Sequence, residues 1–550
     1  MNFSIKRFAS VLWVGMAFAV AAAAAESSVL VGVCGDQGDG TYRNPVIPAD
    51  YSDLDAIRVG DDFYAMSSTF QFSPGVVILQ SKDLVNWRIL GHAVADLTQI
   101  GPELNWNRMN RYGKGIWAGA IRHHAGKFWI YFGTPDEGYF MTTAANPAGP
   151  WEPLTKVLGA PGWDDCCPFW DDDGQGYLVG SNFAKDPATG KAYNIHLWKL
   201  TPDGKGLVPG SDTIIHQSRG SEANKLYKIN GFYYHYYSEV KGEGRVVMMN
   251  RSKSLSGPWE TRQLNHAEKE IDPNQGGLIE LADGRWWFFT HFGTGCWAGR
   301  QANLLPVTWV DGWPILGKPD ANGIGSMVWA AEKPIKGFPV TSTASHDEFN
   351  APELRAEWEW NYQPRPEKWS LAERPGFLRL QAFKPLRPGD LFKAGNTLTQ
   401  RSLCCRESCE VTVKLDIGGM ADGQHAGLCH FAKTRGSIGV KQAAGIRRLV
   451  LDNNGAITEG PVLAGNDLWL QSQWGVDGNS RFFYSLDGRT FTALGTPYPL
   501  SWGNYRGDRI GIFCYNDEAE KGWLDIDWFH YNQIKPTDKA SGKKRDNQEP

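Results

Sequence analysis

Five segments of the chain share one pattern of apolar and polar positions. Each has an apolar strand, then a turn of Gly, Asp or Asn, then a strand rich in aromatic residues. They read AIRVGDDFYAMSS, AIRHHAGKFWIYFG, PFWDDDGQGYLVG, KLYKINGFYYHYY and GLIELADGRWWFFTHF, beginning at residues 56, 120, 168, 225 and 277. Apolar runs on either side of a short turn with Gly are typical of β-hairpins. The pattern therefore predicts five hairpins, with almost no sustained helical periodicity between them.

The hairpins recur at intervals that indicate a repeat architecture. The equivalent apolar residues are spaced by 64, 48, 57 and 52 residues, and they are Ile57, Ile121, Phe169, Leu226 and Leu278. A repeat of about 50 residues with four strands per unit is typical of a β-propeller. We therefore predict an all-β fold with a five-bladed β-propeller over residues 41–330. A plain β-sandwich is the alternative, and the regular hairpins argue against it.

The residue four positions before each equivalent apolar residue is a candidate for chemistry. These five residues are Asp53, Trp117, Asp165, Glu222 and Asn274. The first strand of each propeller blade lines the central channel, so we expect the five side chains to converge at one end of it. Like charges raise one another's pKa, and such carboxyl groups in a cleft are candidates for acid–base catalysis.

Two readings of the carboxylate trio follow from the residues alone. Glycoside hydrolysis needs one carboxylic acid to protonate the leaving oxygen and one carboxylate to activate water or attack directly. A calcium ion is the alternative, because hard cations also recruit several carboxylates. The aromatic neighbours favour the first reading.

The ordered motifs of the first 318 residues resemble glycoside hydrolase family 43. They include YSDLDAIRVGDDFYAMSS, GIWAGAIRHHAGKFWIYFG, WDDCCPFWDDDGQGYLVG, GSEANKLYKINGFYYHYYSE and NQGGLIELADGRWWFFTHFGTGCWAGR, and the resemblance covers nearly all of residues 42–318. This family contains β-xylosidases and α-L-arabinofuranosidases built as five-bladed propellers. The resemblance implies that Asp53 is the general base, Glu222 the general acid, and Asp165 the aspartate that tunes and orients the acid.

The resemblance also implies residues that bind the sugar. Arg300 stands where many members place an arginine near the sugar, and Trp117 and Phe70 stand at positions that often wall the sugar subsite. Asn274 completes the predicted ring as a further substrate-binding residue. Members of the family invert the anomeric carbon, which needs a water molecule between base and sugar, so we expect the two carboxyl groups about 6.5–9.5 Å apart.

Some motifs depart from the family pattern. YPDPS is replaced by YSDLD, and DPCP by DCCP, which places Asp164 beside Asp165. Alternation along a strand predicts that only one of these two neighbours faces the channel, and the repeat offset favours Asp165. The region where many members carry a histidine that supports a channel calcium ion reads Asn274-Gln275. We therefore do not expect calcium in the channel.

The C-terminal third has a different pattern of apolar and polar residues. Alternating strands such as CEVTVKLDI, SRFFYSLDGRTFTAL and KGWLDIDWFHY predict a β-sandwich over residues 345–533. It resembles the concanavalin-A-like jelly roll that follows the propeller in many family 43 β-xylosidases, where a loop often closes one side of the pocket. Asp347 and Asp527 are candidate ligands of a structural Ca2+, with ordinary solvated acids as the alternative. Residues 534–550 predict a disordered tail.

The first 25 residues are typical of a signal peptide. Lys6 and Arg7 precede an apolar run that ends in Ala23-Ala24-Ala25. We therefore expect a secreted or periplasmic protein whose mature form has no membrane span, with residues 26–40 as an N-terminal extension. An uncleaved membrane anchor is the alternative, although the run is short for a span.

Composition excludes some functions. The net charge of −4 gives no electrostatic case for nucleic-acid binding. The nine cysteines have no zinc-site spacing, so we assign neither metal nor disulfide pairing to them. The 24 tryptophans suit sugar faces, but core filling alone would account for them. The histidines, His291 among them, are interpreted as structural.

The leading hypothesis is an exported, exo-acting, inverting glycosidase that acts on plant-wall oligosaccharides and needs no cofactor for its chemistry. β-D-Xylosidase activity is favoured slightly over α-L-arabinofuranosidase activity on the same site. A non-catalytic sugar-binding protein and a retaining fructan hydrolase are the competing readings, although the typical opening motif of the latter is missing. The oligomeric state is left open.

Overall fold

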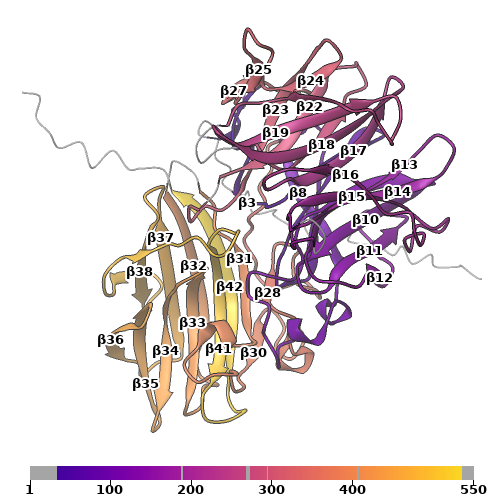
Figure 1. The fold of residues 1–550 in the computed structure, drawn as a ribbon. Coiled ribbons are helices and arrows are strands. Elements are labelled where there is room, and N and C mark those ends of the chain that lie inside the picture. Colours follow the sequence, from indigo (N-terminus) through magenta and orange to yellow (C-terminus); the bar gives the residue numbers. More distant parts are fainter. Residues whose placement is uncertain (1–33, 187–189, 268–272, 294, 405–407, 535–550) are drawn as a thin grey trace, which may run out of the picture.

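The computed structural model describes residues 34–186, 190–267, 273–293, 295–404 and 408–534. The predicted signal peptide and residues 535–550 of the predicted tail lie outside the described residues. Figure 1 shows two bodies, one of indigo to magenta strands and one of orange to yellow strands. In the described residues the regular structure is nearly all β, and the short exceptions are the 3-10 helices η1 (Leu97–Gln99), η2 (Pro102–Leu104), η3 (Pro366–Lys368) and η4 (Leu391–Lys393).

The first body contains five successive antiparallel sheets, each built on four strands in chain order, and the fifth has an additional strand. The first two sheets are β4 (Asp55–Val59), β5 (Asp62–Ser67), β7 (Gly75–Ser81) and β8 (Trp87–Val94), then β9 (Gly119–His124), β10 (Lys127–Thr134), β11 (Gly138–Ala144) and β12 (Thr155–Leu158). The next two are β13 (Trp163–Trp170), β14 (Gly176–Asn182), β15 (Asn194–Lys199) and β16 (Thr213–Gln217), then β17 (Glu222–Ile229), β18 (Phe232–Lys241), β19 (Gly244–Ser252) and β20 (Glu260–Gln263).

The fifth sheet joins the two ends of this body. It contains β21 (Gly276–Glu280), β22 (Trp286–Phe292), β23 (Gln301–Val310) and β24 (Trp313–Leu316), and β3 (Ile47–Asp50) pairs with β23. Each sheet begins with the strand of a predicted hairpin, and these inner strands contact one another in the order β4, β9, β13 and β17, with β21 against β4. Leu278 N of β21 donates to Tyr227 Oη of β17 at 3.2 Å, which closes the circle. We call this arrangement the five-sheet ring.

Local chemistry explains the hairpins. Strand β18 reads FYYHYYSEVK, and aromatic and β-branched side chains suit a pleated, half-buried surface. Between β17 and β18 only Asn230 and Gly231 form the turn, with φ of 51° and 74°. Two positive φ angles are what a tight hairpin turn of the favoured hand requires. The hairpin predicted here is confirmed.

The second body consists of two sheets that pack face to face. One sheet has the order β36 (Ala456–Val462), β35 (Ile446–Asn453), β34 (Arg435–Ala443), β33 (Gln424–Phe431), β41 (Arg509–Asn516), β31 (Thr397–Arg401), β28 (Glu359–Asn361) and β6 (Phe72–Ser73). The other contains β29 (Trp369–Ser370), β30 (Leu378–Gln381), β42 (Trp523–Ile534), β32 (Ser408–Asp416), β37 (Asp467–Trp474), β38 (Asn479–Ser485), β39 (Thr492–Ala493) and β40 (Tyr498–Pro499).

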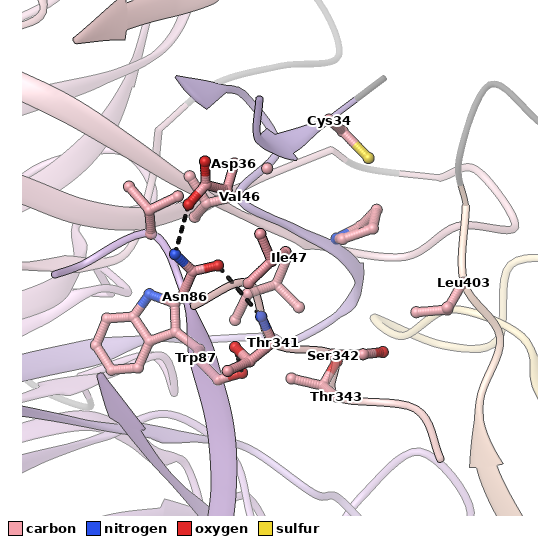
Figure 2. Close-up of a pocket in the computed structure, with 14 residues that line it drawn as sticks. Cys34, Asp36, Val46, Ile47, Asn86, Trp87, Thr341, Ser342, Thr343 and Leu403 are labelled. Carbon is pink, nitrogen blue, oxygen red and sulfur yellow. Dashed lines mark hydrogen bonds between the residues drawn. The ribbon is translucent and has the colours of Figure 1, made fainter. Parts of the chain in front are cut away.

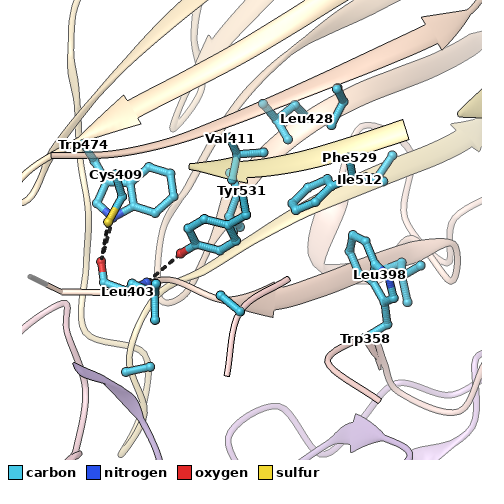
Figure 3. Packing of buried hydrophobic residues seen from close by; sticks show 14 of the residues in the cluster. Trp358, Leu398, Leu403, Cys409, Val411, Leu428, Trp474, Ile512, Phe529 and Tyr531 are labelled. Carbon is cyan, nitrogen blue, oxygen red and sulfur yellow. Dashed lines mark hydrogen bonds between the residues drawn. The ribbon is translucent and has the colours of Figure 1, made fainter. Parts of the chain in front are cut away.

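Apolar side chains from both sheets form the core of the second body. In Figure 3, Leu428 and Ile512 of one sheet and Val411 and Phe529 of the other point into the same layer. The indole of Trp474 donates to Leu403 O at 2.9 Å, which satisfies its one polar group inside this core. This packing gives the second body a rigid frame for the loops that it presents to the ring.

The two bodies share strands and buried charges. Strand β6 leaves the first sheet of the ring and pairs with β28 of the second body. Across the boundary, the buried side chain of His92 in β8 lies 3.0 Å from Glu359 of β28, and Arg401 Nε donates to Asp50 O at 2.8 Å. The second body is therefore fixed against the ring.

Short strands at the start of the described chain and in the segment after the ring close its outer side. They are β1 (Gly35–Asp36), β2 (Thr41–Arg43) and β27 (Ala330–Glu332) in one sheet, with β25 (Lys318–Pro319) and β26 (Gly325–Ser326) in another. Figure 2 shows Asn86 Nδ2 donating to Asp36 and Thr341 N donating to Asn86 Oδ1. Lys333 makes buried ion pairs with Asp36 and Asp83, which holds these segments together.

Candidate active site

One cavity at one end of the five-sheet ring contains every residue predicted there from the sequence. It has a volume of about 220 Å³. Its lining includes all seven of those residues, Asp53, Phe70, Trp117, Asp165, Glu222, Asn274 and Arg300. We call it the site cavity. The five positions of the repeat, each within or just before the first strand of a different sheet, thus meet in one place.

The backbone at the starts of the inner strands is irregular, and this irregularity aims the side chains. The pairing register shifts between Asp164 and Cys167 in β13 and between Glu222 and Lys225 in β17. Asp53, Asp165 and Ala223 have φ of 56°, 52° and 67°. Bulges redirect side chains, and non-glycine residues with positive φ are strained and gather at functional sites. The strain here lies beside the predicted catalytic carboxyl groups.

Asp53 is held from three sides. Its carboxylate accepts a hydrogen bond from Ser68 Oγ at 2.7 Å and pairs with Arg300 Nη1 at 2.5 Å. Its backbone N–H donates to His291 Nδ1 at 2.7 Å. Burial, with the nearby charges of Arg300 and Lys225, holds the pKa of His291 well below its usual value, so the ring stays neutral and can accept. These contacts hold the Asp53 side chain in a fixed orientation.

Asp165 is linked directly to the chain segment that carries Glu222. Its Oδ2 accepts a hydrogen bond from the backbone N–H of Ala223 at 2.7 Å, and its Oδ1 accepts one from Gln275. Gln275 in turn accepts from the buried Lys225 Nζ at 3.1 Å. Burial, and after it the charge of Glu222, raises the pKa of Asp165 to about 7. The two carboxyl groups are thus coupled in both geometry and charge.

Glu222 is the more accessible of these carboxyl groups. Its side chain is 28% exposed, so a substrate can reach it. Its Oε1 lies 3.1 Å from Arg245 Nη1 and 3.4 Å from Asn274 Nδ2. A carboxyl group that faces a cavity beside a second, fixed carboxylate is the arrangement that glycoside hydrolysis uses.

The expectation that Asp164 and Asp165 cannot both face the channel is wrong. Both residues line the site cavity. The register shift after Asp164 and the φ of 52° at Asp165 break the alternation on which the expectation rested. The cavity therefore holds four carboxyl groups, with Asp164 as the fourth.

The second body closes one side of the site cavity with Tyr505. The Tyr505 ring lies 5.6 Å from the Trp117 ring in an edge-on contact, and the Arg300 guanidinium lies 5.6 Å from it. The next residue, Arg506, is fully buried over the Phe72 ring, which anchors the loop. The sequence predicted a closing loop from this domain but not the residue, because nothing in the repeat marks position 505.

Two other contributors were missed. His291 was interpreted as structural, yet it fixes the backbone of Asp53. Arg245 was not singled out, although it forms the ion pair with Glu222. His291 lies at the end of β22 and Arg245 at the start of β19, outside the inner strands that the repeat compares.

The predicted calcium ligands have protein partners. Asp347 accepts hydrogen bonds from Phe349 N and from the Trp358 indole, each at 2.8 Å. Asp527 forms an ion pair with Lys414 at 2.7 Å. Within the described ranges, no group of three or more His, Cys, Asp or Glu residues could hold a metal ion. The calcium site stays a prediction, and no step below depends on it.

Comparisons with known proteins agree with this geometry. The family model described as "Glycosyl hydrolases family 43" matches residues 42–314, and one described as "Beta xylosidase C-terminal Concanavalin A-like domain" matches residues 346–532. A "Beta-xylosidase" of Formosa agariphila is 33% identical over 551 residues, with 92% of each chain covered. A "Non-reducing end alpha-L-arabinofuranosidase BoGH43B" of Bacteroides ovatus is 33% identical over 389 residues, covering 62% of this chain and 65% of that one.

A solved structure extends the likeness. The "Bifunctional GH43-CE" protein of Bacteroides eggerthii superposes with a TM-score of 0.78 at 31% identity, covering 90% of this chain. The present chain spans only 64% of that longer protein. Among the residues that the structure describes, none belongs to a helix long and apolar enough to cross a membrane.

Proposed function

This chain belongs to glycosyl hydrolase family 43, and from that membership we propose that it is an exo-acting and inverting enzyme; from residues 1–25 we propose that it is exported. It is a glycoside hydrolase that acts on oligosaccharides. We propose that it releases terminal pentoses from xylan or arabinoxylan oligosaccharides, most readily β-D-xylose. The observation that carries the proposal is the meeting of Asp53, Asp165 and Glu222 in one small cavity.

The proposed architecture is a five-bladed β-propeller followed by a jelly-roll β-sandwich. Its support is the circle of contacts among the inner strands and the two sheets that pack face to face in the second body. In a propeller, the inner strands surround a channel, and a cavity at one channel mouth is a natural place for a site.

The proposed chemistry divides the work between two carboxyl groups. Asp53 takes a proton from a water molecule, whose oxygen attacks the anomeric carbon on the face opposite the leaving group. As the glycosidic C–O bond breaks, Glu222 gives its proton to the leaving oxygen. Asp165 accepts a hydrogen bond from the N–H of Ala223, the residue after Glu222, and is thereby proposed to orient the acid. Product forms with the anomeric configuration inverted.

The small size of the site cavity supports an exo mode. Its volume of about 220 Å³ lies below the roughly 300–1,000 Å³ that is usual for larger ligands. Tyr505 covers one side of it, against Trp117. A cavity of this size suits one terminal sugar better than an internal stretch of a polysaccharide.

The choice of pentose is less constrained. Xylose and arabinose present similar hydroxyl groups, and the two curated relatives named above carry one activity each. The favoured β-D-xylosidase reading draws on the relative that matches this chain along most of its length. The proposed secreted or periplasmic location rests on residues 1–25, which lie outside the described residues.

The direct test is product release from 4-nitrophenyl β-D-xylopyranoside and 4-nitrophenyl α-L-arabinofuranoside, measured side by side with Glu222→Ala as control. Release of xylose that the variant loses on xylosides with poor leaving groups supports the proposal. Release of arabinose alone keeps the mechanism and replaces the substrate. If both sugars bind but neither glycoside is cleaved, the site is a binding site and the proposal is wrong.

A further inference from the structure

Asp164 differs from Asp53 and Asp165 in having an unused carboxyl oxygen. Its Oδ1 is buried and has no hydrogen-bond partner among the residues the structure describes. By contrast, both carboxyl oxygens of Asp53 and of Asp165 accept protein hydrogen bonds. A buried polar atom without a partner costs free energy unless a ligand or water satisfies it. Because Asp164 also lines the site cavity and is only partly buried as a residue, its carboxyl group keeps hydrogen-bonding capacity at the cavity wall.

The surroundings of Asp164 hold its carboxyl group in place. Tyr139 Oη donates to the backbone oxygen of Asp164 at 2.7 Å. Gly133 lies against the side chain, and a Cβ on Gly133 would lie 3.0 Å from both Asp164 Oδ1 and Asp164 Cα. The glycine thus leaves room that the carboxyl group occupies. A group fixed in this way can contribute to specificity because little side-chain freedom remains to be lost on binding.

The charge state of Asp164 suits a hydroxyl partner. Burial, and then the charges of Asp165, Asp53 and Glu222, raises the pKa of Asp164 well above its usual value. A neutral carboxyl group has one O–H donor and an acceptor oxygen, so it can both donate to and accept from a sugar hydroxyl. The same group is a poor candidate for the catalytic base, because it resists ionisation.

We propose that Asp164 is a specificity-determining residue whose carboxyl group hydrogen-bonds a ring hydroxyl of the pentose in the site cavity. The inference deepens the proposed function and rests on it for the identity of the sugar. It does not change the role of Asp165, whose carboxylate is tied to Ala223 beside Glu222, whereas the carboxyl group of Asp164 is not.

The test compares Asp164→Ala with Asp164→Asn on the cleaved glycoside and on its 2-, 3- and 4-deoxy analogues where the sugar has those hydroxyls. The amide can also donate and accept, so we expect Asp164→Asn to stay within about 3-fold of wild type in KM, while Asp164→Ala raises KM about 10-fold. With the wild-type enzyme, KM should rise by about the same factor on the one deoxy analogue that lacks the contacted hydroxyl. On that analogue, Asp164→Ala should raise KM no further. Asp172→Ala, at an exposed side chain in the turn after β13, is the matched control.

Two outcomes would overturn the inference. One is that Asp164→Ala costs the same on every deoxy analogue as on the parent glycoside. The other is that it shifts only the pH profile of kcat, which would indicate an electrostatic role. Melting temperatures of Asp164→Asn and Asp164→Ala close to that of wild type at pH 4 show that both variants fold.

A binding measurement separates this inference from the proposed function. If wild type cleaves neither glycoside, the proposed function is wrong, and calorimetric binding of free xylose and arabinose still tests Asp164. Affinity about 10-fold weaker in Asp164→Ala than in Asp164→Asn supports the contact. Equal affinity in both variants overturns it.

Discussion

The same five inner strands line two cavities of opposite character, one at each end of the ring. The site cavity lies at the strand starts. The far cavity, of about 590 Å³, lies at the strand ends and is lined by residues such as Ile57, Phe169 and Leu226. Although the far cavity is larger, Glu280 is the one carboxyl group among its described lining residues, whereas four carboxyl groups line the site cavity. Candidate chemistry therefore follows the convergence of carboxyl groups and not volume.

The backbone differs between the two ends in the same way. At the strand starts, Asp53, Asp165 and Ala223 adopt positive φ beside functional side chains. Near the far cavity, the non-glycine residues with positive φ, Ala125 and Asn230, lie in hairpin turns that need this conformation. Near the far cavity, positive φ angles thus allow tight hairpin turns. At the strand starts, they orient carboxyl groups toward the site cavity.

The largest expected difference between the two ends of the ring is in the activity lost when Glu222 or Glu280 is replaced. Glu222→Ala should lower kcat/KM about 10²–10⁴-fold on substrates with poor leaving groups, because the leaving oxygen then lacks its proton donor. On good leaving groups the loss should be smaller. Glu280→Ala, in the lining of the far cavity, should leave the activity within about 2-fold of wild type, since surface changes usually have small effects. Equal losses in the two variants would contradict the comparison.

Asp53→Asn should have the next largest effect. It removes the group proposed to activate water, so turnover should fall about 10²-fold or more for good and poor leaving groups alike. Asp61→Asn, at an exposed residue in the turn before β5, is the control. Normal turnover in Asp53→Asn would show that the base assignment is wrong.

The contribution of the second body can be measured at Tyr505. Tyr505→Ala removes the ring that lies against Trp117 and should raise KM about 10-fold, with a smaller change in kcat. Tyr505→Phe keeps the ring and should stay near wild type. If both variants match wild type in KM, Tyr505 does not help to hold the sugar.

The smallest expected effect concerns stability and its dependence on pH. The raised pKa of Asp164 means that the folded state binds its proton more tightly than the unfolded state. Asp164 therefore does not lower the free energy of unfolding below about pH 3.8, its ordinary pKa. It lowers this free energy increasingly as the pH rises above that value. Asp164→Asn should raise Tm by about 2 °C at pH 8 and much less at pH 4. A gain that is the same at both pH values would show that the charge of Asp164 is not the cause.

The repeat in the sequence was sufficient to find most of the site. An offset of four residues selects Asp53, Trp117, Asp165, Glu222 and Asn274, and the structure brings them into one cavity. This works because equivalent positions in repeated hairpins occupy equivalent places around the ring. The all-β fold follows from the same pattern of alternation and turns.

Other features could not be predicted because they depend on contacts that no local pattern records. The placement of Asp164 depends on a register shift that breaks strand alternation. Tyr505 reaches the ring only because the second body docks there, with β6 paired to β28 across nearly 300 residues of chain. His291 acts through a backbone N–H, which carries no signal in the sequence.

The central claim is that Asp53 and Glu222 act from opposite sides of the sugar. Asp53 activates a water molecule, and Glu222 protonates the leaving oxygen. The most direct test is ¹H NMR of the sugar first released from the glycoside that wild type cleaves, recorded before mutarotation. We predict that the first product has the anomeric configuration opposite to that of the substrate, for example α-xylose from a β-xyloside. A first product with the configuration retained would contradict the account, because it would require a carboxylate to attack the anomeric carbon in place of water.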